Sequence, residues 1–175
     1  ISESPLNADV LWAGTDDGLV QVTRDDGDSW QQADISAVVP EMTLVSRVRW
    51  SHHDEGTLYA TFEAHKDNDF RPYVIKSADY GANWTDLSGD LPQHGPVRVI
   101  IEHPRNPDLL FAGTELGVFV SFTGGAGWLP LGNNLPTVPV HDMVIHPREN
   151  DLVLGTHGRG FWILDDITIL EELSA

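Results

Sequence analysis

The chain has 175 residues, of which 41% are apolar, so it is long and hydrophobic enough to form a domain with a core, which argues against disorder. Asp and Glu total 27 against 10 Lys and Arg, and the net charge of −17 argues against nucleic acid as a partner because phosphate backbones would be repelled. There is no cysteine, which excludes disulfides and thiolate metal sites. No apolar run approaches the roughly 18 to 20 residues of a membrane-crossing helix, so no membrane span is expected.

In chain order, the sequence returns four times to one phrase: a short apolar strand, a Gly-Thr or its remnant, a turn and a second apolar strand. Val, Leu, Phe, Tyr and Trp dominate the strands, and the turns carry the glycines that tight hairpins need. Each copy is therefore predicted to be a β-hairpin of a repeat protein. The hairpins are expected at residues 11–22, 58–76 with a polar insertion at 64–72, 110–120 and 152–164.

A second phrase follows three of the hairpins and joins a polar, glycine-containing turn to a tryptophan. It reads T-R-D-D-G-D-S-W, S-A-D-Y-G-A-N-W and S-F-T-G-G-A-G-W, ending at Trp30, Trp84 and Trp128. These tryptophans lie 54 and 44 residues apart, which is typical of one four-stranded propeller blade per repeat. The polar insertion accounts for the longer step.

Further apolar strands are predicted between the hairpins, at residues 47–50, 97–101 and 141–145. Two of them run into His-Pro, and because proline cannot donate to a ladder, it marks the strand's end. Helix-forming composition is confined to about residues 167–175, too few for the crossovers of a parallel α/β sheet. The predicted fold is all-β, one segment of four blades at about residues 1–35, 36–90, 91–134 and 135–166, with a C-terminal tail at 167–175.

The pattern S/T-x-D-x-G-x-T/S/N-W resembles the Asp-box of the BNR-repeat families: sialidases, two-propeller xyloglucanases, and sortilin-like propellers with their bacterial relatives. The first two copies match it well, whereas the third has Thr123 in place of Asp and Gly127 in the Thr position, which predicts a looser turn. Residues 153–166, V-L-G-T-H-G-R-G-F-W-I-L-D-D, are most similar to the last blade of large bacterial sortilin-like proteins often described as glycosyl-hydrolase-like. The resemblance covers nearly the whole chain and implies a β-propeller of four-stranded antiparallel blades.

The physics of the box favours architecture over chemistry. Its Asp can accept backbone N–H bonds across a tight turn, its Gly permits positive φ, and its Trp can cover apolar space between blades. The resemblance implies that the boxes lie at the blade periphery, away from the ligand face. The predicted structural residues are Asp25, Gly27, Trp30, Asp79, Gly81, Trp84, Gly125 and Trp128. The acidic run at 25–28 lacks the spacing of a calcium loop, so calcium is kept only as an option that the overall acidity suggests.

The two ends of the chain do not match complete blades. Ile1 aligns near Ile100 or Ile101, so the first repeat begins where an inner strand should finish, and the last repeat stops without an outer strand. The chain is thus predicted to be a partial propeller with two complete and two partial blades. An open sector would expose apolar faces and sheet edges. We therefore expect the remaining blades of the parent protein, or another copy of the chain, as a partner.

Propeller ligands usually sit at one end of the channel, on hairpin turns and at the starts of inner strands. Acidic and basic groups are predicted to converge there, and the insertion in the second hairpin is the preferred place for partner contact because no other repeat has it. The catalytic candidates are Asp17, Glu115 and Arg159. The ligand-binding candidates are His65, Asp67, Asp69, Arg47, Arg98, His141 and His157. No histidine has the spacing of a metal site, so no metal is predicted.

The simplest interpretation of these groups is that they are solvated turn residues. Several functions stay open as alternatives to it. Arg47, Arg98 and Arg159 could form the arginine clamp of a sialidase, and Asp17 with Glu115 a glycosidase pair across the channel. The leading hypothesis is a non-catalytic extracellular or periplasmic binding or scaffold module, because the sortilin-like propellers that it resembles bind peptides or proteins; a glycan ligand is a further option. The alternatives are part of a xyloglucanase-like or sialidase-like glycoside hydrolase whose other acids lie on further blades, and a purely structural assembly.

Overall fold

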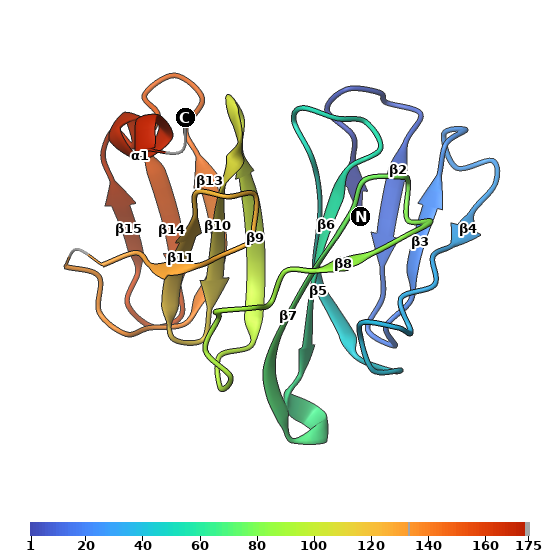
Figure 1. Cartoon of the computed structure of the whole chain (residues 1–175), viewed down its shortest axis with the longest axis horizontal. Helices are drawn as coiled ribbons and strands as arrows, with labels where there is room; N and C mark the ends of the chain where they lie inside the picture. The colour runs from blue at the N-terminus through green and yellow to red at the C-terminus, as the bar shows by residue number, and fades with distance from the viewer. Residues whose placement is uncertain (133, 174–175) are drawn as a thin grey trace.

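The computed structural model of the protein describes residues 1–132 and 134–173 and consists of four antiparallel sheets. The sheets stand side by side like parts of a fan, and apolar cores fill the spaces between them (Figure 1). Within these residues, no helix has the length and apolar character that crossing a membrane requires. The predicted all-β propeller architecture of antiparallel blades is confirmed.

Three sheets have four strands and one has three, and we number them as blades 1 to 4 in chain order. Blade 1 contains β1 (Ser2–Glu3), β2 (Leu11–Gly14), β3 (Val20–Thr23) and β4 (Gln31–Gln32). Blade 2 contains β5 (Leu44–Trp50), β6 (Leu58–Ala64), the 3-10 turn η1 (His65–Asp67), β7 (Asp69–Ser77) and β8 (Thr85–Asp86). Blade 3 contains β9 (Val97–His103), β10 (Asn106–Thr114), β11 (Gly117–Ser121) and β12 (Leu129–Pro130). Blade 4 contains β13 (Val140–Ile145), β14 (Leu152–Thr156) and β15 (Phe161–Leu164), followed by α1 (Thr168–Leu173).

The two end blades are less complete than the two middle blades. The inner strand β1 has only two residues, and it pairs with β2 through Ser2 and Trp12. Blade 4 has no fourth strand among the residues that the structure describes. The sector therefore has two complete and two partial blades, as the alignment of Ile1 with the inner strand of the third repeat predicts.

Each apolar core is shared by two neighbouring blades. Successive residues of a strand point to opposite faces of its sheet. On β10, Leu110 and Ala112 belong to the core between blades 2 and 3, whereas Phe111 belongs to the core between blades 3 and 4. Because every core is built from two sheets, each blade depends on its neighbours for burial.

The Asp-box turns are held by bonds within each turn. The hydroxyl of Thr23 donates to the Asp25 carboxylate at 2.6 Å and accepts the Gly27 N–H at 2.9 Å. Asp25 also accepts the Ser29 N–H at 2.9 Å, and these donors, the Ser29 hydroxyl first, lower the pKa of Asp25 to about 2. Gly27 has φ +93°, a conformation that a side chain would strain. The box around Asp79 repeats the same bonds.

The third box keeps its shape without a carboxylate. The hydroxyl of Ser121 accepts the Gly125 N–H at 2.9 Å and lies 3.3 Å from the hydroxyl of Thr123, which stands in the Asp position. Gly125 has φ +95°, almost the value of Gly27 in the first box. A second hydroxyl therefore accompanies a turn of the same form, in contrast to the looser turn that the departure from the pattern predicts.

The three box tryptophans meet different neighbours. Trp128 is buried, and its Nε1 donates to the Leu87 carbonyl of blade 2 at 2.7 Å. Trp84 lies edge-on against Trp12 of blade 1, with 6.1 Å between ring centroids. Trp30 belongs to blade 1 and is 41% exposed, because no blade precedes its own among the described residues. Each box thus covers the space toward the preceding blade.

Candidate functional site

The antiparallel order of the blades brings hairpin turns and inner-strand starts to one end. The second strand of a blade finishes beside the start of the inner strand, as Thr114 beside Val97 and Thr156 beside Val140 show. We call this the hairpin end. It carries η1 at the lower edge of Figure 1, whereas α1 lies at the upper edge. The predicted ligand-binding residues lie in the hairpin turns or on the inner strands near this end.

Arg98, near the start of β9, bridges two carboxylates at the hairpin end. Its Nη1 donates to Glu63 near the end of β6, and its Nε and Nη2 both donate to Oε2 of Glu115, each at 3.0 Å. Glu63 is buried and also contacts the ring of His65. One guanidinium therefore joins acids of blades 2 and 3 through charge-assisted hydrogen bonds, which are among the strongest that a side chain makes.

Two histidines stack beside this bridge. The rings of His141, on β13, and His157, in the β14–β15 turn, have centroids 5.1 Å apart and an interplanar angle of 26°. The pKa of His141 is lowered from its ordinary value, first by desolvation and then by the charges of Arg98 and His157. A neutral imidazole can both donate and accept a hydrogen bond, so His141 can meet either kind of ligand group.

Arg47 connects blade 2 to blade 4. Its Nη2 donates from β5 to the His141 carbonyl at 3.1 Å and to Asp142 Oδ1 at 3.2 Å, both on β13. Arg49, two residues along β5, has its Nη2 3.7 Å from the same oxygen. These contacts pass over the inner strand of blade 3, so they lie on the channel side of the sector.

The other predicted ligand-binding residues lie in the second hairpin. Asp69 binds Arg71 within that hairpin, with Nη2 and Oδ2 2.6 Å apart, and the pKa of Asp69 falls well below its ordinary value mainly through this partner. Asp67 and Arg159 are exposed turn residues. Of the three arginines of the predicted clamp, Arg47 and Arg98 are paired with carboxylates, whereas Arg159 is exposed in its turn.

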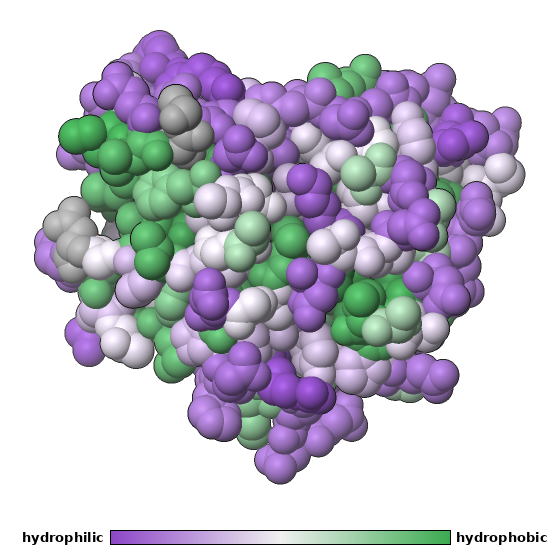
Figure 2. Space-filling view, in the orientation of Figure 1, coloured by the Kyte–Doolittle hydropathy of each residue, from purple (hydrophilic) through white to green (hydrophobic). Residues whose placement is uncertain are grey.

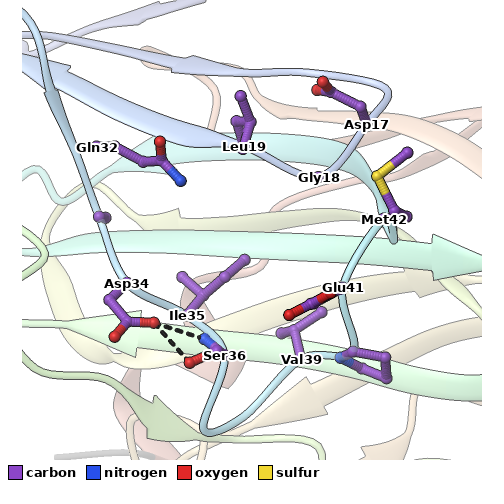
Figure 3. A pocket seen from close by; sticks show the side chains of 12 residues that line it. Asp17, Gly18, Leu19, Gln32, Asp34, Ile35, Ser36, Val39, Glu41 and Met42 are labelled. Carbon is purple, nitrogen blue, oxygen red and sulfur yellow. Dashed lines mark hydrogen bonds between the residues drawn. The ribbon is translucent and has the colours of Figure 1, made fainter.

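Asp17 lies in the β2–β3 turn of blade 1, whereas Glu115 lies in the β10–β11 turn of blade 3. Asp17 accepts a hydrogen bond from Thr15 in its own turn, and it lines a cavity of about 400 Å³ between the β2–β3 turn and residues 33–43. Figure 3 shows the walls of this cavity, where the Asp34 carboxylate accepts the N–H and hydroxyl of Ser36 at 3.0 and 2.7 Å. Glu115 accepts hydrogen bonds from Arg98 in its own blade.

Two charged residues of this region are absent from the predicted set. Glu63 ends the apolar stretch L-Y-A-T-F-E, and a single acid in this position is easily taken for the polar end of a core strand. Its position could have identified it, because it ends a second strand just as Glu115 follows one. Arg49 lies two residues after Arg47 on β5, and residues two apart on a strand share one face of the sheet. This spacing could have identified Arg49 as a neighbour of Arg47.

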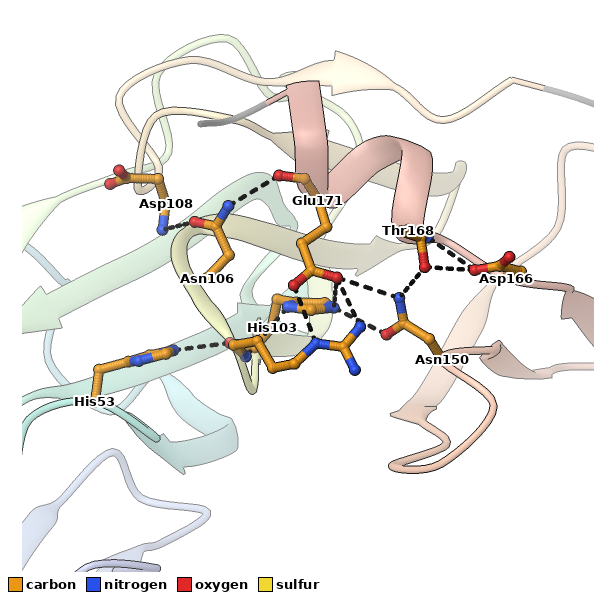
Figure 4. A network of polar contacts seen from close by, with 9 residues as sticks. His53, His103, Asn106, Asp108, Asn150, Asp166, Thr168 and Glu171 are labelled. Atoms are coloured by element: carbon orange, nitrogen blue, oxygen red, sulfur yellow. Dashed lines mark hydrogen bonds and ion pairs between the residues drawn. The ribbon is translucent and has the colours of Figure 1, made fainter.

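The opposite end of blades 3 and 4 carries a polar network that holds α1 (Figure 4). Buried His103 has its Nε2 3.0 Å from Asn150 Oδ1, and its Nδ1 accepts the Arg105 N–H at 3.2 Å. Arg105 pairs with Glu171 of α1 at 2.6 Å. Desolvation lowers the pKa of His103 by more than Asn150 and Glu171 raise it. A neutral histidine that is hydrogen-bonded at both ring nitrogens is thus at the centre of the network that holds the helix on the blades.

A buried carboxylate ties blade 2 to blade 3. Glu102 of β9 accepts the Ser51 hydroxyl at 2.8 Å, the His52 N–H at 2.6 Å and the Tyr59 hydroxyl at 2.9 Å. Burial and this carboxylate raise the pKa of Tyr59 well above its ordinary value. Because its oxygens accept three hydrogen bonds from blade 2, Glu102 stabilises the interface between blades 2 and 3.

No protein-family model and no curated protein matches the sequence, whereas solved structures match the fold. A GH74 enzyme from Niastella koreensis superposes with TM-score 0.73 at 14% identity, over 95% of this chain and 28% of that one. YCF48 bound to a D1 peptide superposes with TM-score 0.67 at 16% identity, over 95% and 51%. The extracellular domain of a putative one-component system from B. thetaiotaomicron does so with TM-score 0.68 at 12% identity, over 95% and 21%.

The repeats, the sheets and these likenesses define a β-propeller. At identities of 12% to 16%, the likenesses establish the fold alone. The chain spans between about a fifth and a half of the matched structures' lengths, so it corresponds to a sector of such a propeller.

Proposed function

We propose that the chain is a non-catalytic binding or scaffold module of an extracellular or periplasmic, sortilin-like propeller protein. The observation that carries the proposal is the contact of Arg98 with both Glu63 and Glu115. A glycosidase needs one carboxyl group that delivers a proton and a second that is free to attack or to activate water. A guanidinium that binds both acids occupies one oxygen of each, Oε2 of Glu63 and Oε2 of Glu115, and competes with a substrate for both.

Peptides and proteins are the ligand class that suits the hairpin end. His141 and His157 offer donors and acceptors, while Asp67 and Arg159 add exposed charges of both signs. A peptide presents backbone donors and acceptors together with charged side chains. YCF48, a propeller of similar fold, was solved with a D1 peptide, which supports a peptide ligand here.

A peptide selection on the immobilised chain tests this function. Peptides that bind are expected to lose at least about tenfold in affinity when His141 and His157 are both replaced by Ala. His146→Ala is the matched control, because this exposed histidine follows β13 at the opposite end. Failure to select any peptide, or full affinity in the double variant, would contradict a peptide site at the hairpin end.

The proposal includes further Asp-box blades as partners, from the parent protein or from a second copy. Blade 4 exposes Phe161 and Ile163, and Figure 2 shows hydrophobic residues gathered on its side of the molecule. Apolar surface of this kind favours association. Light scattering is expected to show self-association of the chain that Phe161→Ser weakens, whereas a monomer at all concentrations would count against a second copy as the partner.

An extracellular or periplasmic location is part of the same proposal. It is supported by the fold likeness to an extracellular domain and by an acidic composition that suits a soluble, exported protein. Fractionation of the native cells is expected to find the parent protein outside the cytoplasm, and recovery in the cytoplasm alone would contradict this part.

A glycoside hydrolase is the second candidate, because a GH74 enzyme shares the fold. In that case Asp17 or Glu115 would act with acids on further blades, in a xyloglucanase-like or sialidase-like reaction. The full parent protein would then release sugar from xyloglucan or sialyllactose. If Glu115→Gln or Asp17→Asn abolished such release in a folded protein, the non-catalytic proposal would fail.

A further inference from the structure

A second cavity lies on the channel side of the inner strands β5, β9 and β13, away from the hairpin turns. Its volume is about 450 Å³. The apolar part of its wall comes from Ile101, Met143 and Ile145, and the polar part includes Arg49 and Asp142. The cavity thus places a guanidinium group beside aliphatic surface.

Arg49 in the wall shares its carboxylate acceptor with Arg47, which lies two residues earlier on β5 at the margin of the cavity. Nη2 atoms of Arg47 and Arg49 lie 3.2 and 3.7 Å from one oxygen, Oδ1 of Asp142. The same oxygen also accepts the Met143 N–H at 3.0 Å. The buried Nε–H groups of both arginines have no acceptor among the described residues. One carboxylate oxygen therefore serves two guanidinium groups, and a second anionic acceptor would be stabilised.

The two guanidinium groups lie close enough to repel each other. The pKa of Arg49 is lowered first by desolvation and then by Arg47, and Asp142 offsets this only in part. The other acid of the wall, Glu102, accepts three donors of blade 2 and makes no ion pair with Arg49 in the described parts of the chain. In a chain of net charge −17, two neighbouring arginines with unmatched N–H donors are a feature that the composition does not predict.

We propose that this cavity binds the carboxylate of a ligand with an apolar carbon chain. Arg47 and Arg49 hold the carboxylate, and the chain rests against the aliphatic wall. The carboxylates of Asp142 and Glu102 balance the two guanidinium charges, so the unmatched N–H donors, and not a net positive charge, favour a monoanion over a phosphate dianion. The wall favours aliphatic or aromatic substituents over a sugar. A free carboxylic acid and the C-terminal residue of a peptide share this chemistry.

The pair differs from the three-arginine clamp that the repeats suggest. Arg47 and Arg49 come from one strand, whereas Arg98 is engaged by Glu63 and Glu115 at the hairpin end. The proposal therefore stands whether or not a peptide binds the histidine pair, and each test can fail alone.

Two acids and their amides test the proposal on the full chain by nuclear magnetic resonance. Isovalerate and N-acetylglycyl-leucine are compared with isovaleramide and N-acetylglycyl-leucinamide, observing the arginine Nε–Hε signals. We expect saturable shifts with dissociation constants on the order of millimolar for an acid and none for its amide. Binding of both acids identifies the carboxylate as sufficient, and binding of the dipeptide alone identifies a peptide C-terminus. No saturation by either acid, or equal shifts by the amides, would overturn the site.

Variants locate the site. Arg49→Gln is expected to weaken the acid at least about tenfold, whereas Arg71→Gln, which removes an arginine of the second hairpin, leaves it unchanged. Asp142→Asn is expected to strengthen binding several-fold because the competing acceptor loses its charge, and exposed Asp28→Asn controls for the general loss of one acid. Since Asp142→Asn predicts a gain, misfolding cannot imitate it. Equal affinity in wild type and Arg49→Gln would overturn the assignment.

Discussion

The interfaces between blades and the open faces of the end blades are built from equivalent residues in different surroundings. Val118 and Val120 of β11 are each 3% exposed because blade 4 covers them. Their counterparts in the strand register of blade 4, Phe161 and Ile163 of β15, are 82% and 59% exposed. The repeat determines which positions are apolar, whereas a neighbouring blade determines which are buried. Stability in such an array follows from nearest-neighbour interfaces.

The largest expected difference between a closed interface and an open face is at the box tryptophans. Trp128→Ala should lower the free energy of unfolding by about 3–5 kcal/mol, because it empties the space against blade 2 and removes the bond to Leu87. Trp30→Ala should cost about 1 kcal/mol or less, because its ring faces no preceding blade. Urea unfolding followed by far-ultraviolet circular dichroism measures both. Equal losses would mean that the box tryptophan stabilises its own turn instead of the interface.

The box glycines sharpen the same comparison. A Cβ on Gly81 would lie 2.5 Å from the Trp12 ring of blade 1, whereas a Cβ on Gly27 would meet no atom closer than 3.9 Å. Both glycines have positive φ, so alanine strains both turns similarly. Gly81→Ala is therefore expected to cost about 1–3 kcal/mol more than Gly27→Ala, the cost of overpacking the interface. The same urea series measures this difference, and its absence would show that the blades separate to admit a methyl group.

Much of this architecture could be predicted from the sequence because it is local and repeated. Strand alternation, hairpin turns and the box phrase each occupy a few neighbouring residues, and the truncated β1 follows from aligning repeats. The solvent exposure of a side chain is harder to predict from the sequence. Trp30, Trp84 and Trp128 end the same phrase, and only the arrangement of blades distinguishes the exposed ring from the buried one.

The side-chain partners at the candidate sites could not be predicted in the same way. The sequence indicates that Arg98 and Glu115 share one end of the blades, but not that Arg98 also binds Glu63 of another blade. Arg47 and Asp142 are 95 residues apart and meet only because blade 3 separates their strands by one inner strand. Such pairs depend on the angle and register between blades, which no local pattern encodes.

Mild acid should destabilise the interface between blades 3 and 4 at the buried His103. His103 has a pKa below its ordinary value of 6.5, mainly because it is desolvated. Its contribution to stability is therefore complete above pH 6.5 and is lost as the pH falls from there toward the lowered pKa, where the unfolded chain takes up the proton first. The urea midpoint should fall between pH 7 and 5. His103→Gln should flatten this slope, at a cost of about 1–3 kcal/mol at pH 7, whereas exposed His94→Gln should leave the slope unchanged.

The smallest expected effect is the loss of the Asp-box carboxylate. It tests whether this carboxylate stabilises its own turn or the interface between blades. The Asp25 carboxylate has a pKa of about 2, so its contribution is present above the ordinary value of 3.8 and is lost as the pH falls through about 2. Asp25→Thr, which copies Thr123 of the third box, should remove this acid-dependent part. Asp79→Thr should behave alike although its box packs on blade 1, because the carboxylate bonds lie within each turn. Urea midpoints between pH 5 and 2 compare the two variants. A much larger loss for Asp79→Thr would place the carboxylate, like the tryptophan, in the interface.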